Sequence, residues 1–201
     1  MRNKKLVAKK TAVLVVDVQR LETQPSYVAD KPYFAERVNQ LVLPNIKSIL
    51  NSARNTGAEV IYTVIESLTA DGRDRSLDHK LSDVHVPKGS VLGEVIEDVA
   101  PINDEIVLKK TSSGVFNSTN LDYVLRNLGV ENLIVVGLLT DQCVDMAVRD
   151  GADRGYYVLC VTDACATHSA ERHTAALNAF SGYCELLASN EVGPRLATDN
   201  K

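Results

Sequence analysis

Six short apolar runs constrain the fold of this chain more than any other feature, because most show no alternation with polar residues. A strand with one face in solvent alternates apolar and polar residues, whereas a strand buried on both faces is apolar throughout. The first run, Thr11 to Asp17, is continuously apolar up to its final acid. The other runs lie at 58–65, 105–110, 132–137, 157–162 and, in a shorter form, 183–187. This pattern predicts a parallel sheet covered on both faces.

Helical patterns fill most of the intervals between these runs. They lie at 44–56, 121–128, 141–154 and 170–181, and each is followed by a glycine: Gly57, Gly129, Gly155 and Gly182. A glycine directly after an apolar periodic segment is typical of a helix C-terminus. Repeated β-α units with right-handed crossovers produce a doubly wound sheet. We therefore expect an α/β fold, a three-layer α/β/α sandwich.

The domain organisation is expected to be simple. The chain has 201 residues, and we predict one domain over 1–201 with a core at about 11–188. Two segments interrupt the rhythm: residues 18–33 are predicted to be a polar loop, and residues 66–90 a long charged loop. A long loop inside a compact domain is often functional.

Charge and cysteine content exclude several functions. The 26 acidic and 22 basic residues give a net charge of −4, which predicts no nucleic-acid partner and no attraction to an anionic membrane. No apolar run approaches the roughly 20 residues needed to span a bilayer, and we see no signal-peptide pattern. The four cysteines show no CxxC or zinc-finger spacing, which favours a reducing, cytoplasmic location.

Reactive side chains stand where the predicted strands end. The first strand ends at Asp17, the third at Lys109-Lys110, and the fourth leads to Cys143 at the start of a helix. Ligands of open parallel sheets bind at the carboxyl ends of the strands. An acid, a base and a thiol are therefore expected to meet at one edge of the sheet.

Cys143 has the placement of a nucleophile. A cysteine in the first turn of a helix is near the positive end of the helix dipole, and a nearby lysine favours the thiolate further. An aspartate within reach can move the proton, and N–H groups of the helix can bind an oxyanion. These groups are the ones that acyl transfer through a thioester requires. Cys160 and Cys184 are predicted to be core thiols, and Cys165 is left as either a reactive loop thiol or a core residue.

Three motifs carry a resemblance to the isochorismatase-like cysteine hydrolase superfamily, in its amidohydrolase branch. They are Asp17-Val18-Gln19, the segment from Lys110 through Phe116 to Leu121, and the segment from Gly137 through Thr140 to Cys143-Val144, and Asp163-Ala164 is a weaker fourth. The resemblance implies a six-stranded parallel sheet in the order 3-2-1-4-5-6. It also implies that Cys143 is the nucleophile, Asp17 the general base and acid, and Lys110 the third member of a triad.

The same resemblance implies how the oxyanion would be held. Members of the superfamily carry a cis peptide before the nucleophile, which here falls between Leu138 and Leu139. The N–H groups of Leu139 and Cys143 would then bind the oxyanion. The expected activity is hydrolysis of non-peptide C–N bonds in small amides or in ureido or carbamoyl compounds.

Several residues are candidates for substrate binding. Glu66, Arg73 and Arg75 follow the second strand, and arginine pairs recognise carboxylates well. The same charged segment is equally explained as a solvated surface. Further pocket candidates are Gln19, Tyr27, Phe116 and Gln142.

No metal and no cofactor are expected. Nicotinamidases of the superfamily bind a metal through an Asp-x-His and a further histidine, whereas here Asp83-Val84-His85 has no second histidine after it and His79 lies before it. Three alternatives stay open: a vinyl-ether hydrolase of the isochorismatase type, a nicotinamidase-like amidase, and a non-catalytic paralogue. The resemblance also favours a homo-oligomer acting on a small molecule.

Overall fold

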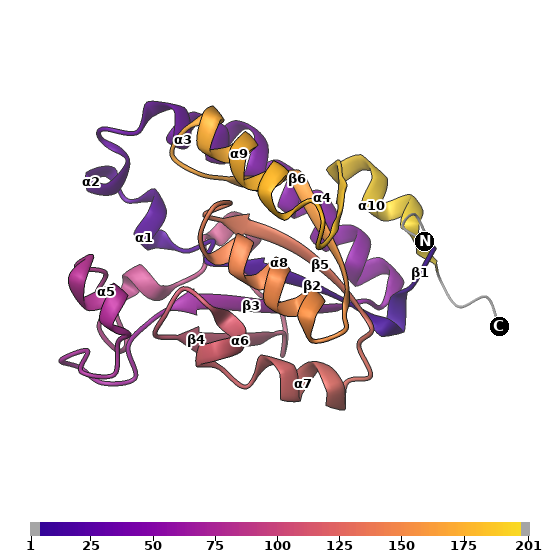
Figure 1. Cartoon of the computed structure of the whole chain (residues 1–201), viewed down its shortest axis with the longest axis horizontal. Coiled ribbons are helices and arrows are strands. Elements are labelled where there is room, and N and C mark those ends of the chain that lie inside the picture. Colours follow the sequence, from indigo (N-terminus) through magenta and orange to yellow (C-terminus); the bar gives the residue numbers. More distant parts are fainter. Residues whose placement is uncertain (1–4, 198–201) are drawn as a thin grey trace.

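A six-stranded parallel sheet forms the centre of the computed structural model, which describes residues 5–197 (Figure 1). The strands are β2 (Thr11–Val16), β3 (Glu59–Ile65), β4 (Ile106–Lys110), β5 (Asn132–Leu138), β6 (Tyr157–Ala166) and β7 (Glu185–Leu187). Their order across the sheet is β4-β3-β2-β5-β6-β7. Counted in chain order these strands run 3-2-1-4-5-6, so the predicted fold class and strand order are confirmed. A separate parallel pair, β1 (Leu6–Val7) with β8 (Leu196–Ala197), joins the two ends of the described chain.

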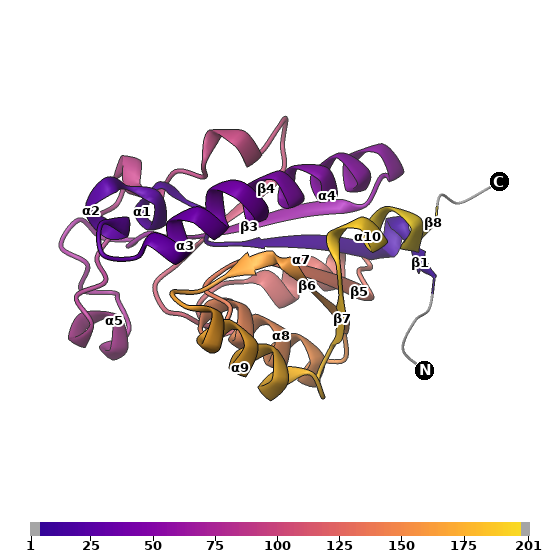
Figure 2. The ribbon, with the colours of Figure 1, turned by 90° about the horizontal axis from the view of Figure 1, so that it is seen from above.

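Helices cover both faces of the sheet, which is why the central strands β2 and β5 are buried along their whole length (Figure 2). In β2, Val13 and Val15 pack on one side in the cluster that holds Ile46 of α4, whereas Leu14 packs on the other with Val144 of α8. The first layer holds α3 (Pro32–Arg37), the π-helical η2 (Val38–Val42), α4 (Leu43–Thr56) and α10 (Ser189–Arg195). The second holds α6 (Val115–Ser118), α7 (Leu121–Asn127), α8 (Cys143–Asp153) and α9 (Ala170–Phe180). No helix among residues 5–197 is both long and apolar enough to cross a bilayer.

The prediction of a polar loop at 18–33 was wrong. This segment folds into α1 (Arg20–Thr23) and α2 (Pro25–Val28), and α3 begins at Pro32. Helices of four residues are too short to show a periodic pattern, so the segment carries no helical signal in its sequence. The 66–90 segment is mostly loop and contains α5 (Leu77–Leu81), which begins after Ser76, whose hydroxyl accepts from the N–H of His79. Two 3-10 turns, η3 (Val91–Gly93) and η4 (Glu97–Val99), precede β4, and η1 (Ala8–Lys10) precedes β2.

Gly137 allows β2 and β5 to approach closely beside the site. It pairs with Val16, and its φ of 124° is one that residues with a side chain rarely adopt. A Cβ at Gly137 would lie 2.1 Å from the backbone oxygen of Val16.

We expect Gly137→Ala to lower the free energy of unfolding by about 3 kcal/mol or more, measured by urea denaturation. The control is Gly182→Ala, where a Cβ meets no heavy atom within 4 Å; an equal effect of both variants would contradict the steric argument.

Candidate active site

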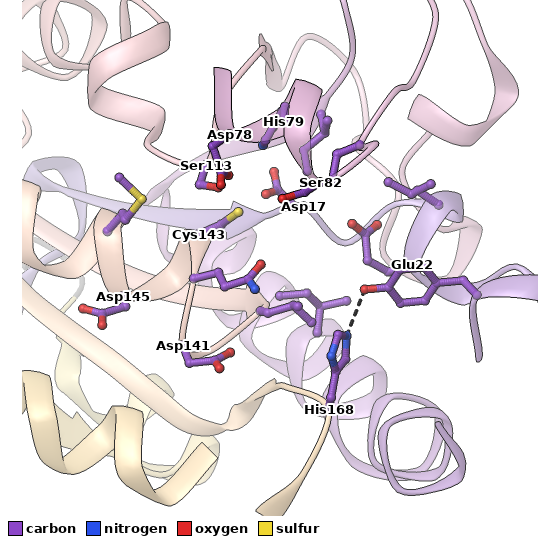
Figure 3. A pocket seen from close by; sticks show the side chains of 18 residues that line it. Asp17, Glu22, Asp78, His79, Ser82, Ser113, Asp141, Cys143, Asp145 and His168 are labelled. Atoms are coloured by element: carbon purple, nitrogen blue, oxygen red, sulfur yellow. Dashed lines mark hydrogen bonds between the residues drawn. The ribbon is translucent and has the colours of Figure 1, made fainter. Parts of the chain in front are cut away.

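Asp17, Lys110 and Cys143 meet at the carboxyl edge of the sheet, around the point where the strand order reverses. Figure 3 shows Asp17 and Cys143 at this edge. Lys110 Nζ lies 2.8 Å from Asp17 Oδ2 and 3.4 Å from Cys143 Sγ. All three residues are buried. Asp17 directly follows β2, Lys110 ends β4, and Cys143 begins α8. Three segments far apart in the sequence therefore place an acid, an ammonium and a thiol in one contact cluster.

Asp17 is held in one orientation by its neighbours. Its backbone N–H donates to Thr63 O at 3.0 Å, and Thr63 Oγ1 donates to Oδ1 at 2.8 Å. Its φ is +52°, in the left-handed region that a residue with a side chain seldom occupies. Such conformations are concentrated at functional sites. The carboxylate of Asp17 is thus fixed by β3 on one oxygen and by Lys110 on the other.

Burial determines the charge states of the cluster. It raises the pKa of the Cys143 thiol to about 12, and the negative charge of Asp17 adds to this while Lys110 opposes it. Burial alone would lower the pKa of Lys110, but attraction to Asp17 and Cys143 raises it. Burial thus favours the neutral thiol over the thiolate that the helix dipole and the lysine were expected to favour. A thiol in this environment keeps its proton unless a neighbouring base accepts it.

The backbone around Cys143 offers N–H groups to a bound atom. The peptide bond between Leu138 and Leu139 is cis. Leu139 O accepts from the N–H groups of Gln142, at 3.1 Å, and Val144, at 3.2 Å, which folds the chain back on itself. Cys143 is the first residue of α8, so its own N–H has no partner within the helix.

His173 of α9 supports this turn from outside the site. Its Nδ1 lies 2.9 Å from Thr140 Oγ1, and Arg37 donates to its Nε2 at 3.0 Å. Because Arg37 has only donors, the proton of His173 is on Nδ1 and is donated to Thr140. Burial and the charge of Arg37 lower the pKa of His173 to about 4, which keeps the ring neutral.

A cavity of about 500 Å³ opens over Cys143 and Asp17. Its wall includes Gln142 and Tyr27, both expected there, and Tyr27 Oη lies 3.0 Å from His168 Nε2. The sequence did not single out most of the other polar residues of the wall: Glu22, Asp78, His79, Ser82, Ser113, Asp141, Asp145 and His168. Several of these stand on short helices or loops whose path depends on the tertiary fold. The sequence pattern marks His79 only as a possible metal ligand, and Asp141 only as part of the segment from Gly137 to Cys143.

Two of the expected binding residues have structural partners instead. Gln19 Nε2 donates to Ile65 O and Leu92 O, both at 3.0 Å, and Gln19 Oε1 accepts from the N–H of Ile65. Glu66 accepts from Lys109 and from the N–H of Gly89, and it lines a second hollow of about 470 Å³. Neither residue lines the cavity over Cys143, because their side chains hold β2 and the following loops in place.

The arginines and Phe116 also lie elsewhere. Arg73 is exposed and pairs with Asp71 at 3.0 Å. Arg75 donates to Gly72 O and Val84 O, both at 3.0 Å, and so orders its own loop. Phe116 stacks on Tyr156 in the core beneath the helices, with ring centroids 6.1 Å apart. The expected carboxylate-binding arginine pair is absent from the wall of the cavity.

The three cysteines other than Cys143 are all buried. Cys160 and Cys184 are buried in the core, as predicted, and Cys165 is buried as well because β6 extends to Ala166. A loop thiol at Cys165 is thereby excluded. His79 lines the cavity and His85 lies beside Gly72. Within residues 5–197, no group of three His, Cys, Asp or Glu side chains is arranged to hold a metal ion.

Comparison with known proteins identifies the family of this chain. The isochorismatase domain family matches residues 11–191. A ureidoacrylate amidohydrolase of Acinetobacter baylyi is 30% identical over 176 residues, covering 80% of this chain and 72% of the relative. An uncharacterized isochorismatase family protein of Bacillus subtilis is 31% identical, covering 78% of each chain.

Solved structures of the same family have the same fold as this chain. A cysteine hydrolase of Pseudomonas syringae superposes with a TM-score of 0.84 at 28% identity, covering 97% of this chain and 98% of the other. An N-carbamoylsarcosine amidase of Thermoplasma acidophilum superposes with a TM-score of 0.74 at 24% identity, covering 90% and 97%, and shares the fold. The chain is therefore a member of the isochorismatase family of hydrolases.

Proposed function

We propose that this chain hydrolyses the C–N bond of small amides or of ureido or carbamoyl compounds through a thioester on Cys143. The observation that carries the proposal is the contact of Lys110 Nζ with both Asp17 and Cys143 in a buried site beneath a cavity. Relatives named as a ureidoacrylate amidohydrolase and an N-carbamoylsarcosine amidase support the choice of bond. A vinyl-ether hydrolase would leave this buried thiol without a role.

The first half of the proposed reaction forms the thioester. Cys143 Sγ attacks the carbonyl carbon while Asp17 accepts the thiol proton, which a thiol with a pKa of about 12 does not release unaided. The N–H groups of Leu139 and Cys143 bind the oxyanion. The C–N bond then breaks, and Asp17 returns the proton to the leaving nitrogen. Lys110 keeps its charge throughout and stabilises the negative charge as it moves from carboxylate to sulfur.

The second half releases the product. A water molecule attacks the thioester carbonyl, and Asp17 takes its proton. The C–S bond breaks, and the proton passes to the departing sulfur, which restores the resting thiol. No step requires a metal or a cofactor. The substrate is a small molecule that fits a cavity of about 500 Å³, and the cytoplasmic location and homo-oligomeric state stay predictions.

The experiment that tests this proposal combines a substrate screen with trapping of the intermediate. Ammonia release is measured with a panel of acyclic amides, ureido compounds and nicotinamide, and the active reactions are quenched in acid for mass spectrometry. We expect release from at least one acyclic compound and an acyl adduct on the peptide that contains Cys143. Turnover without any adduct, even under rapid quenching with a slowly hydrolysed substrate, would contradict the thioester route.

A further inference from the structure

Glu22 is a buried acid in the cavity that the reaction described above does not use. It stands on α1, between the end of β2 and the cavity, and only 6% of its surface is exposed. Its Oε2 has no hydrogen-bond partner among the residues the structure describes. Figure 3 shows its carboxyl directed into the cavity that Asp17 and Cys143 also line. A buried polar atom without a partner is costly, so it points to a group that binds there.

The charges of the cavity restrict what that group can be. Three of the carboxylates in its wall are already paired with cations: Asp17 with Lys110, Asp141 with Arg172, and Asp145 with Arg149. Within residues 5–197, no lysine or arginine lines the cavity. Burial lowers the pKa of His79 and of His168, which favours their neutral forms. A substrate carboxylate would thus enter an acidic cavity without a free cation to neutralise it.

Glu22 itself is suited to a neutral partner. Burial raises its pKa well above the ordinary value, and the nearby charge of Asp17 raises it further while Lys110 opposes this. A protonated carboxyl offers one O–H donor and one carbonyl acceptor. A carboxamide or ureido group offers the complementary carbonyl and N–H, so the two can form a pair of hydrogen bonds. A carboxylate offers only acceptors and adds a charge that must be desolvated.

We propose that Glu22 is a substrate-binding residue that pairs with an uncharged carboxamide or ureido group and disfavours substrates that carry a carboxylate. The inference rests on the proposed function, because it names the substrate class of the same cavity. It also separates this chain from the relatives named as ureidoacrylate amidohydrolases, since an acrylate is a carboxylate. The residues that would have reversed this preference, Arg73 and Arg75, bind their own loop instead.

The test compares two ligands that differ only at one end, 3-ureidopropionamide and 3-ureidopropionate. Calorimetry with the Cys143→Ala protein measures binding without the proposed reaction. We expect the amide to bind at least tenfold more tightly than the carboxylate. Equal affinities, tighter binding of the carboxylate, or no measurable binding of the amide would each overturn the inference. Turnover by the Cys143→Ala protein would instead count against the proposed function, so the two failures are distinguishable.

Variants of Glu22 separate binding from a structural role. In the same Cys143→Ala background, Glu22→Leu should weaken binding of the amide by about tenfold or more. The ratio of the amide affinity to the carboxylate affinity should fall toward 1. Glu22→Gln keeps a donor and an acceptor of the same size and should recover most of that affinity. The matched control is Glu36→Leu, at an exposed acid of α3. If Glu22→Leu retains the amide affinity, the inference fails; if it does not fold, the two-ligand comparison and Glu22→Gln still decide.

Discussion

Replacing Cys143 with alanine is expected to lower kcat by about ten-thousandfold or more for any amide that the protein hydrolyses. The thioester route has no substitute for the sulfur, and loss of a nucleophile in a comparable site has effects of this order or larger. The cavity over Asp17 stays intact, so substrate affinity should change little. Steady-state rates and calorimetric binding of the same compound measure the two effects separately.

A second buried cysteine provides the control. Cys184 lies in the core, where its Sγ is 3.8 Å from Phe180 O, and it does not line the cavity. Cys184→Ala should lower stability by about 1 kcal/mol and leave kcat within twofold. If Cys143→Ala retained more than about a tenth of the activity, the sulfur would not form the bond. Hydrolysis by Asp17 and a water molecule without the thiol, as in a vinyl-ether hydrolase, would then explain the activity better.

The layers of this fold could be predicted because the sheet is buried on both sides. Uninterrupted apolar runs such as Leu133 to Val136 require cover on two faces, and Gly57 ends its helix in the left-handed conformation at φ 77°. The order of the strands could not be predicted in this way, because an apolar run such as 105–110 does not indicate which strands lie beside it in the sheet. The order came from resemblance to a family, and the structure agrees with it.

The candidate triad could be predicted for a related reason. Asp17, Lys110 and Cys143 each stand at the end of a recognisable strand or the start of a helix, so topology alone brings them to one edge. The candidate substrate-binding residues do not all stand at the end of a predictable strand or helix. Arg73 reaches Asp71 only two positions away, and a charge pattern does not distinguish this local pairing from a ligand site. Glu22 was missed because its short helix has no periodic signal.

Replacing Lys110 with methionine is expected to cost both activity and stability. Lys110 and Asp17 form an ion pair in which the side chains are 0% and 2% exposed. Removal of the ammonium leaves a buried carboxylate unpaired, which destabilises proteins by about 3–5 kcal/mol. Asp17 also loses the ion-pair partner beside which it is proposed to accept the thiol proton, so kcat should fall by about a hundredfold or more. Urea unfolding and steady-state rates measure the two losses.

The double variant distinguishes an ion pair from simple packing. Asp17→Asn combined with Lys110→Met removes both charges, so it should be about 2 kcal/mol more stable than Lys110→Met alone while remaining inactive. Lys109→Met is the matched control, because its ammonium pairs with Glu66 at 2.7 Å but its side chain is 48% exposed. That variant should lose no more than about 1 kcal/mol and keep its activity. Additive losses of stability in the double variant would show that Lys110 stabilises the site through packing. Equal losses of stability and activity in Lys109→Met would remove the basis for assigning the catalytic ammonium to Lys110.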